Sequence, residues 1–472
     1  QATDWFFSQQ EFVIQGATLV WTDELRGAPP LSLDAVDLVV RNGVRRHELR
    51  LDATPPAEWG ERFSLRGHFT QPLLARPVEG QGGLLARPGD WRRWVGTLYA
   101  DLPSADIAPL RRQVDLPFDL SRGAGALRAW VEVKNAEPVA ATVDLALRDV
   151  ALRLAADAEP LAFERIDGRL SGRPPLGDAG GARSGELQAR QFGFVTVDGL
   201  HWPAADATLR WRLDEAGALA GGELRAQRLD LALLAQTLGR LPVGWIGADM
   251  HTRVASLAPT GIASEVEARW DGPLVAPLRY RLQANLRGLG LAAAAAAAPA
   301  EGASAPAWRP GRPGLQGADI ELTASESGGE ATLSLSDGAL EFPGVFEQPR
   351  IALKRLGSRL NWRIDVGAGG APPRIELRAR EVRFANDDAQ GEFEATWHTG
   401  GEAGRLPGVL ELNGRLSDAL APRVARYLPL GLPASVRQYV ERAVQAGRAN
   451  AVNFKVSGDL RQFPFGAPAS TG

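Results

Sequence analysis

The chain has 472 residues, with 53 Lys or Arg against 56 Asp or Glu, a formal net charge of −3, and no cysteine. That charge balance argues against a nucleic-acid-binding protein, because such proteins need a basic surface for the phosphates. The lack of cysteine excludes disulfides, cysteine-based metal sites and thiol catalysis. It is consistent with an oxidising compartment, where stray thiols are a liability.

The sequence shows no signal peptide and no apolar run of about 18 residues, the length that indicates a transmembrane helix. It begins at Gln1 without a methionine, and the apolar stretch Trp5-Phe6-Phe7 follows at once. We therefore expect an internal or N-terminal-half fragment of a longer protein, without that protein's membrane anchor.

Alternation of apolar and polar residues recurs along nearly the whole chain and predicts β-strands. Residues 141–147 read Ala-Thr-Val-Asp-Leu-Ala-Leu, and residues 374–380 read Arg-Ile-Glu-Leu-Arg-Ala-Arg. Successive side chains of a strand point to opposite faces, so each segment has an apolar face and a charged face that is often rich in Arg. Turn residues separate the segments, the first of which spans Glu11 to Trp21. We predict a mainly β protein with one apolar side.

Helix signals are few. Asp106, Asp230 and Ser417-Asp418 each precede a helical run that ends at a Leu-Pro pair, and an Asp at such a position can cap a first turn. The clearest helix runs from Val436 to Val444, with apolar residues at helical spacing and Gly447 as the expected C-cap.

Patterns that carry reaction chemistry are absent from the sequence. The five histidines show no metal-ligand spacing, and no nucleophile elbow, P-loop or Rossmann fingerprint occurs. Asn386-Asp387-Asp388 is typical of a hairpin turn rather than of a catalytic carboxylate pair. We predict no catalytic residues, no metal site, no cofactor and no enzymatic activity.

Several segments resemble the AsmA-like superfamily, and in particular its YhdP family. They are Ile14-Gln15-Gly16-Ala17, the run from Trp94 to Leu102, the turn from Leu257 to Gly261, and the run from Phe454 to Leu460. The resemblance implies a large periplasmic protein of Gram-negative bacteria, anchored in the inner membrane and related to bridge-like lipid transfer proteins. It implies a long, twisted antiparallel sheet curled into a U-shaped groove with a few short helices. Phospholipid is thought to move along that groove towards the outer membrane.

The residue patterns lead to a similar expectation. A long sheet with one apolar side can be covered by helices, closed on itself, or left open as a groove for an apolar ligand. The helix signals are too few to cover the whole sheet, so an open groove is the simplest solution. The groove candidates are the apolar residues of the segments with the cleanest alternation: Val143, Leu145, Leu147, Leu209, Trp211, Leu213, Ile375, Leu377 and Ala379. The alternative is that they fill an ordinary closed core.

We expect three groove segments along the chain. Residues 1–120 form the first, with a short helix, and residues 121–290 the second, also with a short helix. A low-complexity loop or linker, rich in Ala, Pro and Gly, spans residues 291–317. Residues 318–472 form the third segment, which ends in two helices and a strand.

The function that these expectations favour is conduction of phospholipid acyl chains from the inner to the outer membrane across the periplasm. Two alternatives stay open: a structural or assembly factor of the cell envelope that acts through outer-membrane or periplasmic proteins, and an enzyme acting on polysaccharide. Co-purified phospholipid, a stoichiometric protein partner, or turnover of glycans would separate the three.

Overall fold

The structure is a computed structural model that describes residues 5, 7–22, 30–71, 91–106, 109, 119–155, 160–177, 183–241, 247–274, 276–296, 310–366, 372–400 and 405–460. The chain divides into two compact units. Unit 1 holds residues 1–224 and 240–245, and unit 2 holds residues 225–239 and 246–472.

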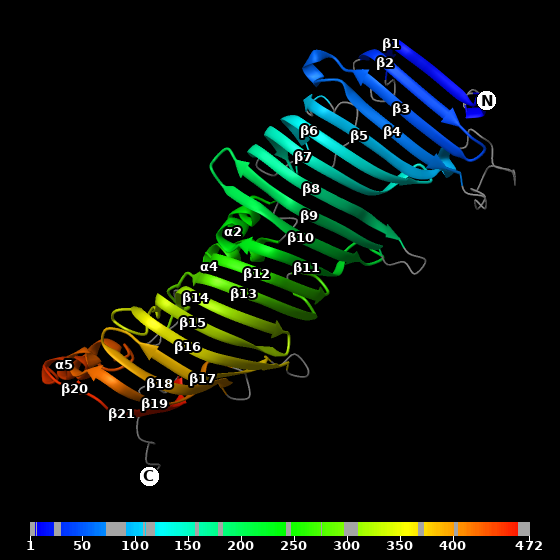
Figure 1. Cartoon of the computed structure of the whole chain (residues 1–472). Coiled ribbons are helices and arrows are strands. Elements are labelled where there is room, and N and C mark those ends of the chain that lie inside the picture. Colours follow the sequence, from blue (N-terminus) through cyan, green and yellow to red (C-terminus); the bar gives the residue numbers. More distant parts are fainter. Residues whose placement is uncertain are drawn as a thin grey trace, which may run out of the picture. The chain divides into compact units, whose positions relative to one another are not determined.

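Unit 1 contains an antiparallel sheet in which β1 to β10 lie side by side in chain order, each paired with the next (Figure 1). Its strands are β1 Glu11–Trp21, β2 Leu31–Asn42, β3 Arg46–Thr54, β4 Phe63–Thr70, β5 Val95–Asp106, β6 Asp119–Lys134, β7 Glu137–Arg153, β8 Leu161–Gly177, β9 Arg183–Thr196 and β10 His201–Leu213. The following strand, β11 Leu219–Asp230, begins in unit 1 and ends in unit 2.

Unit 2 repeats this arrangement from β12 to β19, and β19 then pairs with both β20 and β21. Its strands are β12 Thr260–Asp271, β13 Arg279–Leu291, β14 Gly314–Ser325, β15 Gly328–Glu341, β16 Arg350–Asp365, β17 Arg374–Ala385, β18 Ala389–Gly400, β19 Arg405–Leu420, β20 Arg448–Ala449 and β21 Val452–Asp459.

The helices in the part of the chain that the structure describes are short. They are η1 Ala57–Trp59, η2 Trp91–Arg93, α2 Leu231–Arg240, α4 Ala248–Leu257, η5 Ala421–Tyr427 and α5 Ala434–Ala443, where η marks a 3-10 helix. None of those in the described ranges is both long and apolar enough to cross a membrane. The predicted fold class is confirmed: the chain is mainly β, its neighbouring strands are antiparallel, and its described helices are few and short.

The predicted helix starts have different outcomes. Asp230 caps α2 as expected, since its Oδ1 accepts hydrogen bonds from the backbone N–H groups of Ala232 and Leu233. Asp418 was wrongly predicted as a cap: β19 continues to Leu420, and the Asp418 carboxylate pairs with Arg448 instead. The helix after Asp106 falls almost wholly on residues outside the described ranges, as does the middle of the predicted loop at 291–317, residues 297–309. The proposed three-segment division stays a prediction.

β-Bulges recur on one side of the sheet in both units. On this side, each of several strands is interrupted by a residue whose backbone φ lies in the left-handed region. These residues are Gly16, Ala35, Asp149 and Gln191 in unit 1, and Glu265, Gly288, Gly317, Asp337 and Glu381 in unit 2. An Asp of the neighbouring strand accepts the N–H of several bulged residues: Asp37 from Gly16, Asp206 from Gln191 and Asp319 from Gly288. Bulges bend a strand and increase its twist, so they favour curling of the sheet.

The buried clusters lie towards this bulged side. Leu33, Val36 and Ala53 form one, and Leu120, Leu147, Val150 and Ile166 form a second, both in unit 1. In unit 2 the cluster is Leu289, Ala318, Leu335 and Leu353, and Leu231 of α2 packs against it. Helix α2 is therefore held by its own N-cap and by this apolar contact.

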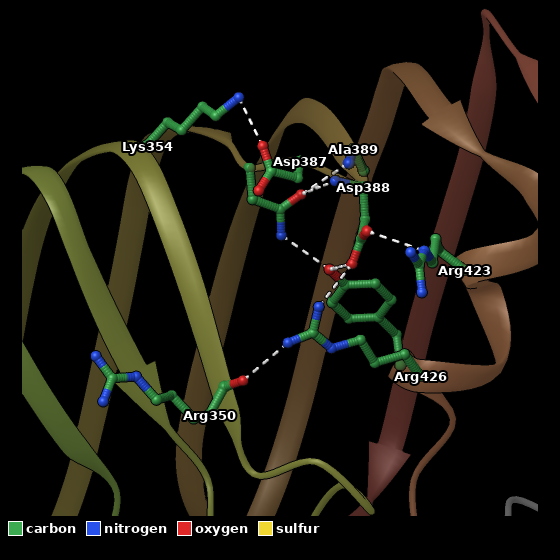
Figure 2. A network of polar contacts seen from close by, with 9 residues as sticks. Arg350, Lys354, Asp387, Asp388, Ala389, Arg423 and Arg426 are labelled. Atoms are coloured by element: carbon green, nitrogen blue, oxygen red, sulfur yellow. Dashed lines mark hydrogen bonds and ion pairs between the residues drawn. The ribbon is translucent and has the colours of Figure 1, made fainter.

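Helix η5 is fixed to unit 2 by a buried carboxylate (Figure 2). Asp388, in the predicted β17–β18 hairpin turn, is 7% exposed and accepts hydrogen bonds from Arg426 at 2.9 Å and from the Tyr427 hydroxyl at 2.9 Å. Arg423 lies 3.5 Å from its other oxygen. Burial, together with the bond to Asp388, raises the pKa of Tyr427 to about 12.

Candidate functional site

An unbroken apolar row crosses every strand of unit 1 from β1 to β10. Each member is paired with the next across the sheet: Ile14, Leu38, Leu51, Leu65, Ala100, Ala129, Val143, Leu170, Ala189 and Ala207. Every one of them is half-buried. Because side chains in paired positions share a face, the row forms a continuous apolar strip at right angles to the strands.

A second row runs parallel to the first and is displaced from it by two residues on each strand, towards the side of the sheet opposite the bulges. Its members are Phe12, Val40, Leu49, Gly67, Leu98, Val131, Ala141, Gly172, Leu187 and Leu209. Two residues of a strand span about 6.6–6.8 Å, so the two strips together are wide enough for an extended hydrocarbon chain.

Unit 2 has a matching pair of rows on one face of its own sheet. The first is Ala268, Leu282, Ala324, Gly329, Trp362, Leu377, Trp397, Leu410 and Gly458. The second is Ala284, Leu322, Ala331, Leu360, Ala379, Ala395, Leu412 and Val456. We call the face that carries these rows the apolar face of each unit.

The exposed fractions of the side chains in these rows show whether the apolar face is open or is covered by a second sheet. Where two sheets pack face to face, the inward side chains interdigitate and are closely covered. Most members of the rows are only half-buried, and Leu187 is exposed. Among the described residues, therefore, no second layer covers the apolar face along its length.

The opposite face is polar and carries its own cross-strand ladder. In unit 1, Arg128 pairs with Asp101 at 3.3 Å, and Arg169 pairs with Asp144 at 2.5 Å. The hydrogen bond from Arg169 lowers the pKa of Asp144 from its ordinary value. In unit 2 an unbroken polar row runs through Glu267, Gln283, Thr323, Glu330, Asn361, Arg378, Thr396, Glu411 and Ser457. Each sheet thus has one wettable and one apolar side.

The structure places all nine predicted groove residues on the apolar faces. Val143 and Leu209 belong to the rows of unit 1, and Leu377 and Ala379 to the rows of unit 2. The other five lie at two-residue steps from these on the same strands: Leu145, Leu147, Trp211, Leu213 and Ile375. Leu147 is buried in a core cluster, whereas the other eight are half-buried. Their contact with lipid stays a prediction.

Sequence reasoning missed most of the row members. Leu49 and Leu51 or Leu98 and Ala100 alternate as clearly as the chosen segments, so the pattern could have identified them. The glycines Gly67, Gly172 and Gly329 gave no such signal, because only pairing across the sheet places them in an apolar row.

The described part of the chain holds no candidate metal site. No group of three or more His, Asp or Glu side chains there lies close enough to hold a metal ion. His47 is 3% exposed and stacks on Trp94 with ring centroids 3.9 Å apart. Burial lowers the pKa of His47. The ring therefore contributes to packing.

An antiparallel sheet with an extended apolar face is the architecture of a protein that handles apolar ligands. The chain belongs to the YhdP family, whose model, described as YhdP protein, matches residues 1–469. Neither a curated protein nor a solved structure matches it. Membership of this lipid-transfer family indicates an AsmA-like role in lipid transport and a protein of the cell envelope.

Proposed function

We propose that this chain binds phospholipid acyl chains on its apolar face and conducts them across the strands, so that phospholipid passes from the inner to the outer membrane through the periplasm. In this proposal the full-length protein is anchored in the inner membrane. The observation that carries the proposal is the unbroken, half-exposed apolar row through each unit, for example from Ile14 to Ala207.

The energetics of such a surface suit transfer. Each methylene removed from water stabilises the bound chain by about 0.8 kcal/mol. A strip of similar aliphatic residues offers the same gain at every step, so a bound chain has no preferred stopping point and can slide. The polar face, with pairs such as Arg169–Asp144, keeps the other side of the sheet in water.

Photo-crosslinking tests the proposal. A photoreactive amino acid at Leu145 or Leu377 is expected to label phospholipid from mixed phosphatidylethanolamine and phosphatidylglycerol vesicles. The matched controls are Ala146 and Arg380, which lie on the polar face of the same strands, β7 and β17. Labelling at the controls but not at Leu145 and Leu377 would contradict the proposal. Native mass spectrometry separates it from the assembly-factor alternative, which predicts a stoichiometric protein partner instead of phospholipid.

A further inference from the structure

Trp211 lies over a glycine on the apolar face of unit 1. It pairs across the sheet with Gly185, and Leu187 and Leu209 pair beside them. A Cβ built on Gly185 would overlap the six-membered part of the indole, with Cε2 at 2.5 Å and Cη2 at 3.0 Å. The ring therefore occupies the space that any other residue's side chain would fill, and it lies against the backbone of β9.

The same arrangement recurs in unit 2. Trp362 pairs with Gly329, and a Cβ there would lie 2.5 Å from the indole Cζ2. Gly414 lies between Phe393 and Phe454 on the neighbouring strands, and a Cβ built on it would overlap the side chains of both. Glycine inside a strand costs stability and commonly marks a close approach. Here that close approach is of an aromatic ring to the strand beside it, which keeps a bulky residue low on the sheet.

We propose that Gly185 sets the depth of the lipid path by letting the Trp211 ring lie flat as part of its floor, in contact with the acyl chain. This inference rests on the proposed function. A side chain at position 185 would force the ring away from the sheet, because the backbone of β9 lies beneath it. The raised ring would stand in the path of the chain.

The test compares Gly185→Ala with Gly43→Ala, a glycine of unit 1 that lies outside both apolar rows. Gly185 is a clean site, because the three nearest atoms that its Cβ would meet all belong to the Trp211 side chain, which can rotate away. At Gly43, which is exposed between β2 and β3, a Cβ would make one ordinary contact, of 3.6 Å, with the Arg46 carbonyl. Gly329 is unsuitable, because a Cβ there would also meet the backbone of β14.

A photo-crosslinker at Leu209 reports local occupancy by phospholipid from the same vesicles, and one at Leu145 reports the path elsewhere in unit 1. If the raised ring displaces about two methylenes, labelling at Leu209 falls roughly tenfold in Gly185→Ala. Labelling stays native in Gly43→Ala, and Gly185→Ala/Trp211→Ala restores it. Melting temperature is measured for each variant.

Each outcome decides a separate point. Native labelling at Leu209 in a folded Gly185→Ala variant overturns the inference. Should that variant unfold, three double variants replace it, in which Gly185→Ala is combined with Trp211→Phe, Trp211→Leu or Trp211→Ala. In these double variants, labelling at Leu209 is expected to rise as the side chain at position 211 becomes smaller. If it does not rise, the inference is overturned. Absence of labelling at both Leu209 and Leu145 in the unaltered chain would instead refute the proposed function.

Discussion

The two units carry the same apolar face with different surroundings. In unit 1 the row from Ile14 to Ala207 is purely aliphatic, and the described helices, η1 and η2, are three-residue turns. In unit 2 the corresponding row places Trp362 and Trp397 on either side of Leu377. Unit 2 also holds α4, η5, α5 and most of α2.

The comparison shows which features form the apolar face, the strands and their bulges, and which are additions to the sheet, the helices. Alternating strands with bulges on one side occur in both units, so they are sufficient to make an apolar face. Few contacts hold the helices: α2 has its N-cap at Asp230 and the packing of Leu231, and η5 has the polar contacts of Asp388. They are therefore expected to affect local stability in unit 2 without changing the face itself.

The largest effect is expected from a charge on either apolar face. Leu377→Asp and Leu145→Arg each place an unpaired charge on the proposed path, at a desolvation cost of several kcal/mol. Both should abolish phospholipid co-purification. Leu145 also packs against the buried cluster around Leu147, so its variant should lose melting temperature as well, whereas Leu377→Asp should melt near the native value.

Ala146→Arg, on the polar face of β7, is the control and should leave lipid and stability unchanged. Full lipid occupancy in a folded Leu145→Arg/Leu377→Asp variant would sink the groove hypothesis for this chain. Loss of folding in both single variants would favour the closed-core alternative.

The next largest effect concerns the attachment of η5. Asp388→Asn removes the charge that Arg423 and Arg426 share and should destabilise this part of unit 2 by about 2–3 kcal/mol. Limited proteolysis should then cut within Ala421–Tyr427 before it cuts unit 1. Equal cleavage of variant and native chain would contradict the assignment.

The Tyr427 hydroxyl gives a pH test of the same contact. Its pKa is raised to about 12, above the ordinary value of 10, so the folded state retains the proton that the unfolded chain releases. The stabilising contribution is complete below pH 10 and is lost as the pH rises through about 12. Burial and the bond to Asp101 raise the pKa of Tyr99 as well. In spectrophotometric titration the late transition of Tyr427 should move towards 10 in Asp388→Asn, whereas that of Tyr99 should stay unchanged.

A smaller effect is expected at the N-cap of α2. Asp230→Ala removes the acceptor for two backbone N–H groups and should cost about 1 kcal/mol. Asp418→Ala is the matched control, because that residue makes an exposed ion pair with Arg448 and caps no helix, so a smaller loss of stability is expected. Chemical denaturation measures both. A larger loss for Asp418→Ala would reverse the assignment.

The smallest effect should be equal in the two units. Asp37→Asn in unit 1 and Asp319→Asn in unit 2 weaken the same bulge contact, to Gly16 and Gly288 respectively, at partly exposed sites. Each should cost about 0.5 kcal/mol. The Gly288 N–H and then Arg287 lower the pKa of Asp319, so its contribution is present above the ordinary value and lost as the pH falls through the lowered one. Thermal unfolding at several acidic pH values measures it, and unequal costs at neutral pH would show that the bulges differ.

Local pattern was enough to predict the strands and the polarity of their faces. The first strand, expected from Glu11 to Trp21, coincides with β1, and the alternation around Leu145 and Leu377 assigned their faces correctly. The N-cap of α2 was equally readable, since Asp230 bonds to N–H groups two and three residues away. In each case the determining contacts lie within a few residues of sequence.

Tertiary structure alone decided which side chains meet across the sheet. Asp418 carries the same local signal as Asp230 but bonds to Arg448, 30 residues away. Trp211 lies over Gly185, and Leu377 lies between two tryptophans, only because bulges and hairpin turns fix the register of β9 with β10 and of β16 with β17 and β18. A one-residue slip would turn these side chains to the opposite face. Register depends on pairing between distant segments, which residue-by-residue propensity does not encode.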